Sequence, residues 1–496
     1  MRLMFSLCGV ALTLPALAAQ PTVAATATAA DTARAVCAGK LSREVLAAQA
    51  LRRAREAAAL NAFVTLDDAG ALQAARAQQA GARHGACRPL EGVPIVVKDN
   101  IEVAGLPSTG GTPALSGYVP QADAPVVQRL RAAGAIVIGK TNMHELAFGV
   151  SGWNPAFQSG PEPGVRNAYD PTRIAGGSSS GTAAALGARV VLAGLGTDTG
   201  GSLRIPCAFN GCASLRPTVG RYPPQGILPI SHTRDTAGPM AVAMSDVELL
   251  DRVITSAPRA TAARLAGLRL GRVKQLVAGL DADSQQAYDA ALQRLARAGV
   301  TIVDLDLPQL PELAGAVGFP VALYEAFDDV SAYLAGTGTG VTITSLAQQI
   351  ASADVKATYL GLVIPRKLPG PDNTLVDAKP AYDSAMQAAR PALQKLYQDT
   401  FARHRLDALV FPTVPHVAIG ANAEASSTAN FLAMIRNTDP GSNAGLPGVQ
   451  LPMALGASSG LPVGLALDGP AGSDRRLIAI GMSIQALLGP LPAPAP

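Results

Sequence analysis

The chain has 496 residues, of which 48% are hydrophobic and only 15% are charged, and its formal net charge is +4. This length and composition predict a well-packed globular protein with one large core or two to three domains, and they exclude extensive disorder. The small net charge and the lack of any Lys- or Arg-rich run argue against nucleic acid as a partner.

The N-terminus has the pattern of a cleaved secretory signal peptide. An Arg stands at position 2, an apolar run follows over residues 3–17, and the small residues Ala16 and Ala18 suit a cleavage site. We therefore expect residues 1–19 to be removed and the protein to be periplasmic or secreted. No later stretch offers about 18 uninterrupted apolar residues, so we expect no membrane span in the mature chain.

Four cysteines would remain after export: Cys37, Cys87, Cys207 and Cys212. An even number in an oxidising compartment allows one or two disulfides. The alternative is four buried thiols in a core that needs no covalent links. The chain contains neither a C-x-x-C motif nor a Cys/His cluster, so we expect no metal.

The first expected element after the signal peptide is a flexible, alanine-rich segment over residues 20–34. Residues 41–60 repeat apolar positions at helical spacing with Arg and Glu between them, which predicts an amphipathic helix on the main body. Residues 92–100 form a β-branched run that ends in polar residues. We predict a buried strand there, whose C-terminal end presents Lys98.

Strands and helices alternate along the rest of the chain. Further strands are predicted over residues 134–140, 273–276, 301–305 and 406–411, and helices over residues 124–133, 182–192 and 283–298. Such alternation with short connections is typical of an α/β layered sheet. Residues 336–340 and 365–371 are predicted surface loops rather than hinges between domains, and no internal repeat is evident.

Two stretches rich in glycine and serine mark where we expect the chemistry. The first cluster is Gly176-Gly177-Ser178-Ser179-Ser180-Gly181, and the second cluster is Gly196-Thr197-Asp198-Thr199-Gly200-Gly201-Ser202-Leu203-Arg204. Glycines leave backbone N–H groups uncovered, which favours the binding of an anion or an oxyanion. The helix expected after the first cluster adds the positive end of its dipole. This pattern predicts acyl or phosphoryl chemistry.

The spacing of residues around the two clusters disfavours phosphate binding, and the chain lacks the Ser-x-x-Lys motif of penicillin-binding proteins. A P-loop requires Lys and then Ser or Thr after its last glycine, but Thr182 and Ala183 follow Gly181. The glycine spacing of a dinucleotide-binding motif also fails around Gly194 and Gly196. No lysine has a serine three residues before it, which excludes the Ser-x-x-Lys arrangement of penicillin-binding proteins.

A nucleophile elbow of the α/β-hydrolase type is the main alternative. Residues 177–181 match its G-x-S-x-G pattern with Ser179 in the middle. Three downstream histidines could complete a Ser–His–Asp esterase triad: His232, His404 and His416. The elbow needs a strong strand directly before it, and residues 171–175 make a weak one.

The two clusters and the residues around Lys98 are similar to the amidase signature family. Val97-Lys98-Asp99-Asn100 lies upstream, and the interval between Ser178 and Ser202 fits that family's pattern. Similar segments also occur over residues 139–148, 235–239 and 437–445. Together they are most similar to the indoleacetamide and mandelamide hydrolase branch.

The resemblance implies one amidase domain over residues 35–490. Its fold would be a single α/β/α sandwich around a large twisted mixed β-sheet, in agreement with the alternation of strands and helices. The resemblance also implies catalysis without a metal or an organic cofactor.

By resemblance, Lys98, Ser178 and Ser202 form the catalytic triad. Lys98 would take a proton from Ser178, Ser178 would take one from Ser202, and the Ser202 oxygen would attack the amide carbonyl. The relay serine would follow a cis peptide bond after Gly177. A lysine acts as a base only when neutral, so its pKa must fall by roughly three units from ~10.4. We expect burial of Lys98 to supply this shift, and a surface pair with Asp99 is the alternative.

The second cluster would also supply the oxyanion hole. By resemblance, its donors are the backbone N–H groups of Thr199, Gly200, Gly201 and Ser202. Each such donor is worth about 10²–10³ in rate. Asp198 and Arg204 are expected to hold the loop by hydrogen bonds and a salt bridge, and Ser179 is expected to assist the relay.

The substrate pocket is expected close to residues 139–148. Ala147, Phe148 and Trp153, the only Trp in the chain, lie in the segment that walls the acyl pocket in relatives. A position of Trp153 in the core is the alternative.

These observations predict an exported serine amidohydrolase that cleaves the C–N bond of a small, aryl-bearing carboxamide through an acyl-enzyme. Alternatives on the same fold are hydrolysis of peptide amides, oligoamides or esters, and a binding or assembly subunit without catalysis. An amidotransferase role on charged tRNA is opposed by the signal peptide and by the lack of a basic surface. The expected partner is a small-molecule amide, and a homodimer is the default assembly.

Overall fold

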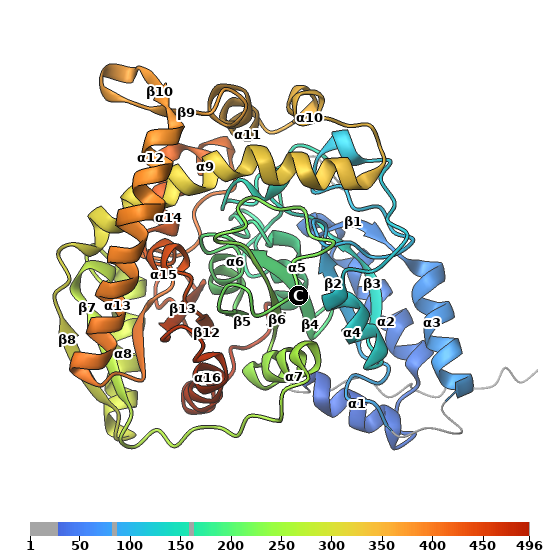
Figure 1. Cartoon of the computed structure of the whole chain (residues 1–496). Coiled ribbons are helices and arrows are strands. Elements are labelled where there is room, and N and C mark those ends of the chain that lie inside the picture. The colour runs from blue at the N-terminus through green and yellow to red at the C-terminus, as the bar shows by residue number, and fades with distance from the viewer. Residues whose placement is uncertain (1–27, 82–86, 158–162, 496) are drawn as a thin grey trace, which may run out of the picture.

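An eleven-stranded mixed β-sheet runs through the middle of the molecule, and helices lie on both of its faces (Figure 1). The computed structural model describes residues 28–81, 87–157 and 163–495. The strand order of the sheet is β1-β3-β2-β4-β6-β5-β12-β13-β11-β7-β8. The expected α/β/α sandwich around a mixed sheet is confirmed.

The bounds of the elements are as follows. The large sheet contains β1 (Phe63–Leu66), β2 (Pro94–Lys98), β3 (Ile136–Thr141), β4 (Ala193–Asp198), β5 (Ala213–Arg216), β6 (Thr236–Ala241), β7 (Arg269–Val273), β8 (Thr301–Leu305), β11 (Ala408–Pro412), β12 (Gly448–Leu455) and β13 (Pro462–Asp468), and a separate hairpin contains β9 (Lys367–Pro369) and β10 (Leu375–Asp377). The helices are α1 (Ala29–Cys37), α2 (Arg43–Glu56), α3 (Asp68–Gly81), α4 (Pro125–Ala132), α5 (Ser180–Gly187), α6 (Arg204–Asn210), α7 (Met244–Thr255), α8 (Ala282–Arg297), α9 (Leu310–Thr337), α10 (Ile343–Gln349), α11 (Ala353–Thr358), α12 (Ala378–Ser384), α13 (Arg390–His404), α14 (Thr428–Ile435), α15 (Asp439–Ala444) and α16 (Asp474–Leu488).

Strand β2 shows how one short apolar run serves both layers of the sandwich. Ile95 and Val97 belong to the core that includes residues of α4 and α7, whereas Val96 belongs to the core that includes residues of α2 and α5. This alternation follows from the two-residue period of a strand. The strand pairs in parallel with β3 and β4, so Lys98 lies at the carboxyl edge of three parallel strands.

Helix α1 corrects the second half of the flexible segment expected over residues 20–34; residues 20–27 lie outside the described residues. Residues 29–34 are helical, and Ala29 and Ala33 are buried in the main core. Thr28 and Asp31 form a capping box, and the Asp246 carboxylate accepts the N–H of Ala29 at 2.7 Å. Alanine-rich sequence favours a helix once caps satisfy its first N–H groups, which a purely compositional argument overlooks.

Three element boundaries also differ from expectation. The strand predicted over residues 273–276 ends at Val273, and residues 274–276 form a 3₁₀ turn instead. The loop predicted over residues 365–371 contains β9, which pairs with β10 on the surface. The helix predicted over residues 182–192 ends at Gly187, so β4 can begin at Ala193. Only the β9–β10 hairpin among these differences comes from strand pairing.

The signal peptide expected over residues 1–19 lies outside the described residues. Among the helices that the structure describes, none combines the length and the apolar character that crossing a membrane requires.

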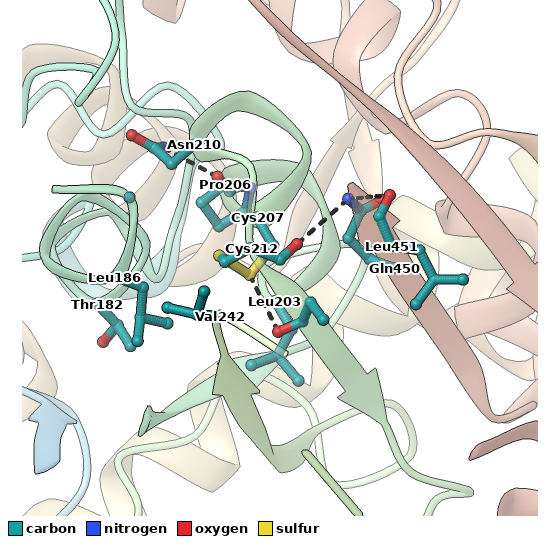
Figure 2. The surroundings of a disulfide bond; sticks show 12 residues. Thr182, Leu186, Leu203, Pro206, Cys207, Asn210, Cys212, Val242, Gln450 and Leu451 are labelled. Carbon is teal, nitrogen blue, oxygen red and sulfur yellow. Dashed lines mark hydrogen bonds between the residues drawn. A yellow bond between two sulfur atoms is a disulfide. The ribbon is translucent and has the colours of Figure 1, made fainter. Parts of the chain in front are cut away.

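Two disulfides pair the four cysteines. Cys37 at the end of α1 is bonded to the exposed Cys87. Cys207 in α6 is bonded to Cys212, and both are fully buried between α6 and the start of β5 (Figure 2). The structure therefore favours the disulfide expectation over four buried thiols.

We expect mild reduction of the native protein to release Cys37 and Cys87 well before Cys207 and Cys212. A reductant must reach the sulfur, and only the first pair is exposed. The measurement is alkylation after graded reductant, followed by peptide mass spectrometry. Reduction under denaturant is the control and should label all four. Four alkylated cysteines in unreduced, denatured protein would contradict both disulfides.

Candidate active site

Lys98 is the last residue of β2, and its side chain is completely buried. Its Nζ lies 2.7 Å from Ser178 Oγ and 2.7 Å from Thr197 Oγ1, and it donates a hydrogen bond to each. Asp99 forms an ion pair with Lys140 at 3.0 Å instead. The alternative of a surface pair between Lys98 and Asp99 is therefore wrong.

Burial makes Lys98 a usable base. Desolvation lowers the pKa of Lys98 to about 7, although the negative charges of Asp198 and Asp235 oppose the shift. Near neutral pH a large fraction of the amine is therefore unprotonated. A lysine in this state can accept the proton of a neighbouring hydroxyl.

We expect kcat/KM to fall about tenfold per pH unit below about pH 7, where Lys98 becomes protonated. Above that pH the amine is neutral and accepts a proton, whereas below it the amine is charged and cannot. The measurement is kcat/KM for amide hydrolysis from about pH 5 to about pH 9. The His404→Gln variant is the control and should keep the same acid limb. Activity that stays constant down to about pH 5 would rule out Lys98 as the base.

Ser178 and Ser202 come from the two clusters, which the backbone holds side by side. The peptide bond between Gly177 and Ser178 is cis, and the Ser179 N–H donates to the carbonyl of Ser202 at 3.2 Å. Ser178 is fully buried, and Ser202 is 5% exposed. The structure thus joins Lys98 directly to Ser178, whereas no hydrogen bond links the two serine hydroxyls among the described residues. The Ser202 hydroxyl has no protein partner there.

Asp198 braces the loop that carries Ser202. Its carboxylate accepts the N–H groups of Gly201 at 2.8 Å and Leu203 at 3.1 Å, and it pairs with Arg204 at 3.1 Å. Arg216, which the sequence did not indicate, also pairs with Asp198 at 2.9 Å. Burial alone would raise the pKa of Asp198, but the two guanidinium groups outweigh it and hold that pKa well below its usual range. The carboxylate therefore stays charged.

The expected oxyanion hole needs one correction. The Gly201 N–H donates to Asp198, so it is not available to a substrate oxygen in this structure. In the part of the chain that the structure describes, the N–H groups of Thr199, Gly200 and Ser202 have no protein acceptor. These three donors lie beside Ser202, so they are placed to bind an oxyanion if Ser202 attacks the carbonyl as predicted. The Thr199 hydroxyl donates to Asp235 at 2.6 Å, which anchors the start of the loop.

Ser179 braces the two clusters. Its hydroxyl donates to the Thr197 carbonyl at 3.1 Å and accepts the Thr197 N–H at 3.2 Å. This contact holds the start of α5 against the end of β4, so any effect on the relay is indirect. The nucleophile-elbow alternative is wrong, because the hydroxyl of Ser179 faces backbone rather than an imidazole.

The three histidines that could have completed a Ser–His–Asp triad make their contacts with residues other than Ser179. His232 interacts with Asp329, His416 contacts the carbonyl of Val417, and His404 ends α13. Among the described residues, one group has side chains close enough together to hold a metal ion: His232, Glu325 and Asp329. Glu325 already accepts hydrogen bonds from two hydroxyls of residues 231–233, which accounts for the cluster without an ion.

The expected pocket residues are only partly brought together. Ala147 packs with Met143 and Ile230, and Phe148 makes an edge contact with Tyr359 at 5.0 Å between ring centroids. Trp153 is half-buried, and its backbone N–H donates to the Ser151 hydroxyl. The structure gives no contact between Trp153 and Phe148, so a pocket role for Trp153 stays a prediction.

Ala147 and its neighbour Leu146 have an unusual backbone conformation. Their φ angles are 59° and 53°, in the left-handed region that side chains disfavour. The Leu146 N–H donates to the carbonyl of Gly110 at 2.8 Å, which helps to hold this bend. Local strain of this kind gathers where a fold positions functional groups.

The sequence did not indicate several residues of the site, because their contacts join segments that are far apart in the chain. Thr197 accepts the hydrogen bond of Lys98, and Asn100 donates to the same oxygen at 3.1 Å. Thr438 donates to the carbonyl of Gly200 at 2.7 Å across 238 residues. All three residues stood inside the segments named from the sequence, but no local spacing indicates the contact of Thr438 with Gly200.

Comparison with known proteins points to enzymes that hydrolyse amides. The family model described as Amidase matches residues 44–478. Mandelamide hydrolase of Pseudomonas putida is 46% identical, over 90% of this chain and 88% of its own. Indoleacetamide hydrolase of Agrobacterium vitis is 39% identical, over 88% of this chain and 91% of its own. The structure of native peptide amidase from Stenotrophomonas maltophilia has a TM-score of 0.78 and 28% identity, covering 94% of this chain and 98% of that one.

Proposed function

Because this chain belongs to the amidase family and is an amidohydrolase of linear amides, we propose that it cleaves a small, aryl-bearing carboxamide through an acyl-enzyme on Ser202. The observation that carries this proposal is the contact of the buried Lys98 amine with Ser178, beside the loop of Ser202. A neutral amine, a relay hydroxyl and a hydroxyl without a protein partner are the groups that acyl transfer requires.

The proposed reaction has two halves. Lys98 takes the proton of Ser178, Ser178 takes that of Ser202, and the Ser202 oxygen forms a bond to the carbonyl carbon. The C–N bond then breaks, and the proton held by Lys98 returns through Ser178 to the departing nitrogen, which leaves as ammonia or an amine. Water then loses a proton through Ser178 to Lys98 and attacks the ester carbon. The bond from that carbon to the Ser202 oxygen breaks, the proton returns through Ser178 to Ser202, and the carboxylic acid leaves. The free N–H groups beside Ser202 stabilise the oxyanion in both halves.

The aryl preference is supported by the relatives named mandelamide hydrolase and indoleacetamide hydrolase. A panel of phenylacetamide, mandelamide, indole-3-acetamide, butyramide, a peptide amide and an aryl ester, read as kcat/KM, tests it. Burial of one aromatic ring should favour aryl over aliphatic amides by about 10- to 100-fold. Faster turnover of the peptide amide would favour the alternative function, hydrolysis of peptide amides, since the peptide amidase shares this fold.

The proposal includes export and a homodimer. Two disulfides support an oxidising compartment, because such bonds persist there and are rare in a reducing cytosol. N-terminal sequencing of protein expressed with its leader tests export: a mature chain that begins near residue 20 is expected, and a cytoplasmic chain with its leader intact opposes it. Light scattering of the purified protein tests the dimer.

A further inference from the structure

The peptide between Gly200 and Gly201, which directly precedes the nucleophile, is held at both ends. Its carbonyl oxygen accepts a hydrogen bond from Thr438 Oγ1 at 2.7 Å, and its N–H donates to Asp198 Oδ1 at 2.8 Å. The C=O and N–H of a trans peptide point in opposite directions, so these two bonds together fix the orientation of the peptide plane.

This restraint matters because two glycines flank the peptide. Gly201 has φ of 144°, and a Cβ there would lie 2.3 Å from Thr438 Oγ1. The chain therefore uses glycine where it must approach Thr438 closely, and glycine also permits many other backbone conformations. Without an external contact, the peptide could turn and carry the neighbouring N–H groups with it.

Thr438 is itself immobilised in the network that braces the loop. It is fully buried, and its carbonyl accepts hydrogen bonds from Arg204 at 3.1 Å and from Ser442 at 3.0 Å. Arg204 in turn pairs with Asp198, which holds the other end of the peptide. Both ends of the peptide thus depend on one connected set of buried contacts.

We propose that Thr438 is a positioning residue of the oxyanion hole. Its hydroxyl holds the Gly200 carbonyl away from the reacting carbon, and this leaves the N–H groups of Gly200 and Ser202 to stabilise the oxyanion. The inference rests on the proposed function for the identity of Ser202 as nucleophile, but not on an aryl substrate. Thr438 acts through the loop and does not touch the substrate.

The test compares Thr438→Val, which keeps the shape but removes the donor, with Thr438→Ser, which keeps the donor. We expect kcat of Thr438→Val to fall about 10- to 100-fold with KM nearly unchanged, somewhat less than the loss of one oxyanion donor costs. Thr438→Ser should stay within about threefold of wild type. Affinity for a trifluoromethyl ketone analogue, which forms an oxyanion on the enzyme, should fall in parallel with kcat.

The Thr400→Val variant is a matched control, because the Thr400 hydroxyl also donates to a backbone carbonyl at 2.7 Å, within α13. It should leave kcat and ketone affinity unchanged. If Thr438→Val does not fold in a thermal melt, Thr438→Ala replaces it. Wild-type kcat in the donor-lacking variant, or equal losses in the Ser and Val variants, would overturn the proposal.

These measurements use whichever amide the wild-type enzyme turns over best. A different substrate preference would therefore overturn the aryl proposal while leaving the role of Thr438 open to this test. Conversely, a full loss of activity in Ser202→Ala with no effect of Thr438→Val would support the proposed function and overturn the role of Thr438.

Discussion

Replacing Ser202 by alanine should abolish amide turnover, with kcat reduced by at least about 10⁴-fold. The hydroxyl has no protein hydrogen bond among the described residues, so its loss removes the proposed attacking oxygen without breaking such a bond. The fold should therefore survive. The measurements are ammonia release under saturating substrate and a thermal melt of the same preparation.

Ser116→Ala is the matched control, because Ser116 is exposed on the surface; it should keep wild-type kcat. Intact-mass spectrometry with an activated aryl ester adds a direct readout. Wild type should carry one acyl group on the peptide that contains Ser202, and Ser202→Ala should carry none. An adduct on Ser179 would restore the nucleophile-elbow mechanism, and retained amidase activity in Ser202→Ala would overturn the assignment of the nucleophile.

Replacing Lys98 by alanine should be nearly as damaging, with kcat/KM reduced by about 10³- to 10⁴-fold. Among the residues that the structure describes, Lys98 Nζ at 2.7 Å is the basic group in contact with Ser178 Oγ, so its removal leaves that hydroxyl without a proton acceptor there. Lys98→Met keeps more of the buried volume and should behave the same way. The measurement is kcat/KM at about pH 8, where the wild-type lysine is mostly neutral.

The residual activity of Lys98→Met should also lose the acid limb near pH 7, which ties the limb to this residue. Lys395→Met is the control, since Lys395 is exposed and pairs with Asp399 on the surface of α13. A loss smaller than about tenfold in both Lys98 variants would show that another base activates the serine.

The strand that ends at Lys98, the proposed base, could be predicted from the sequence because an apolar run gives way to polar residues at that position. Ile95, Val96 and Val97 form an apolar run, and Lys98 ends it, so both the strand and the buried amine follow from a local pattern. The serine clusters were recognisable for a similar reason. Glycine and serine at this density serve tight loops close to a reacting group better than they serve packing.

The contacts that orient these loops could not be predicted, because they join residues far apart in the chain. Arg216 reaches Asp198 from β5, and Thr438 reaches Gly200 from the start of α15. The Gly201 N–H was assigned to the oxyanion hole because its place in the motif suggests it. Its true acceptor, Asp198, depends on which way one peptide turns, and composition carries no information about that orientation.

The arginines around Asp198 also influence the strength of the base. Asp198 lies close enough to Lys98 to favour the protonated amine, which would weaken the catalyst. Arg204 and Arg216 place two positive charges against the same carboxylate, and these charges offset its field at Lys98. With Lys98 as the proposed base, the contacts that brace the loop of Ser202 are therefore expected also to affect the pH range of activity. Loss of one of these guanidinium groups, far along the chain from Lys98, would move that range towards alkaline pH.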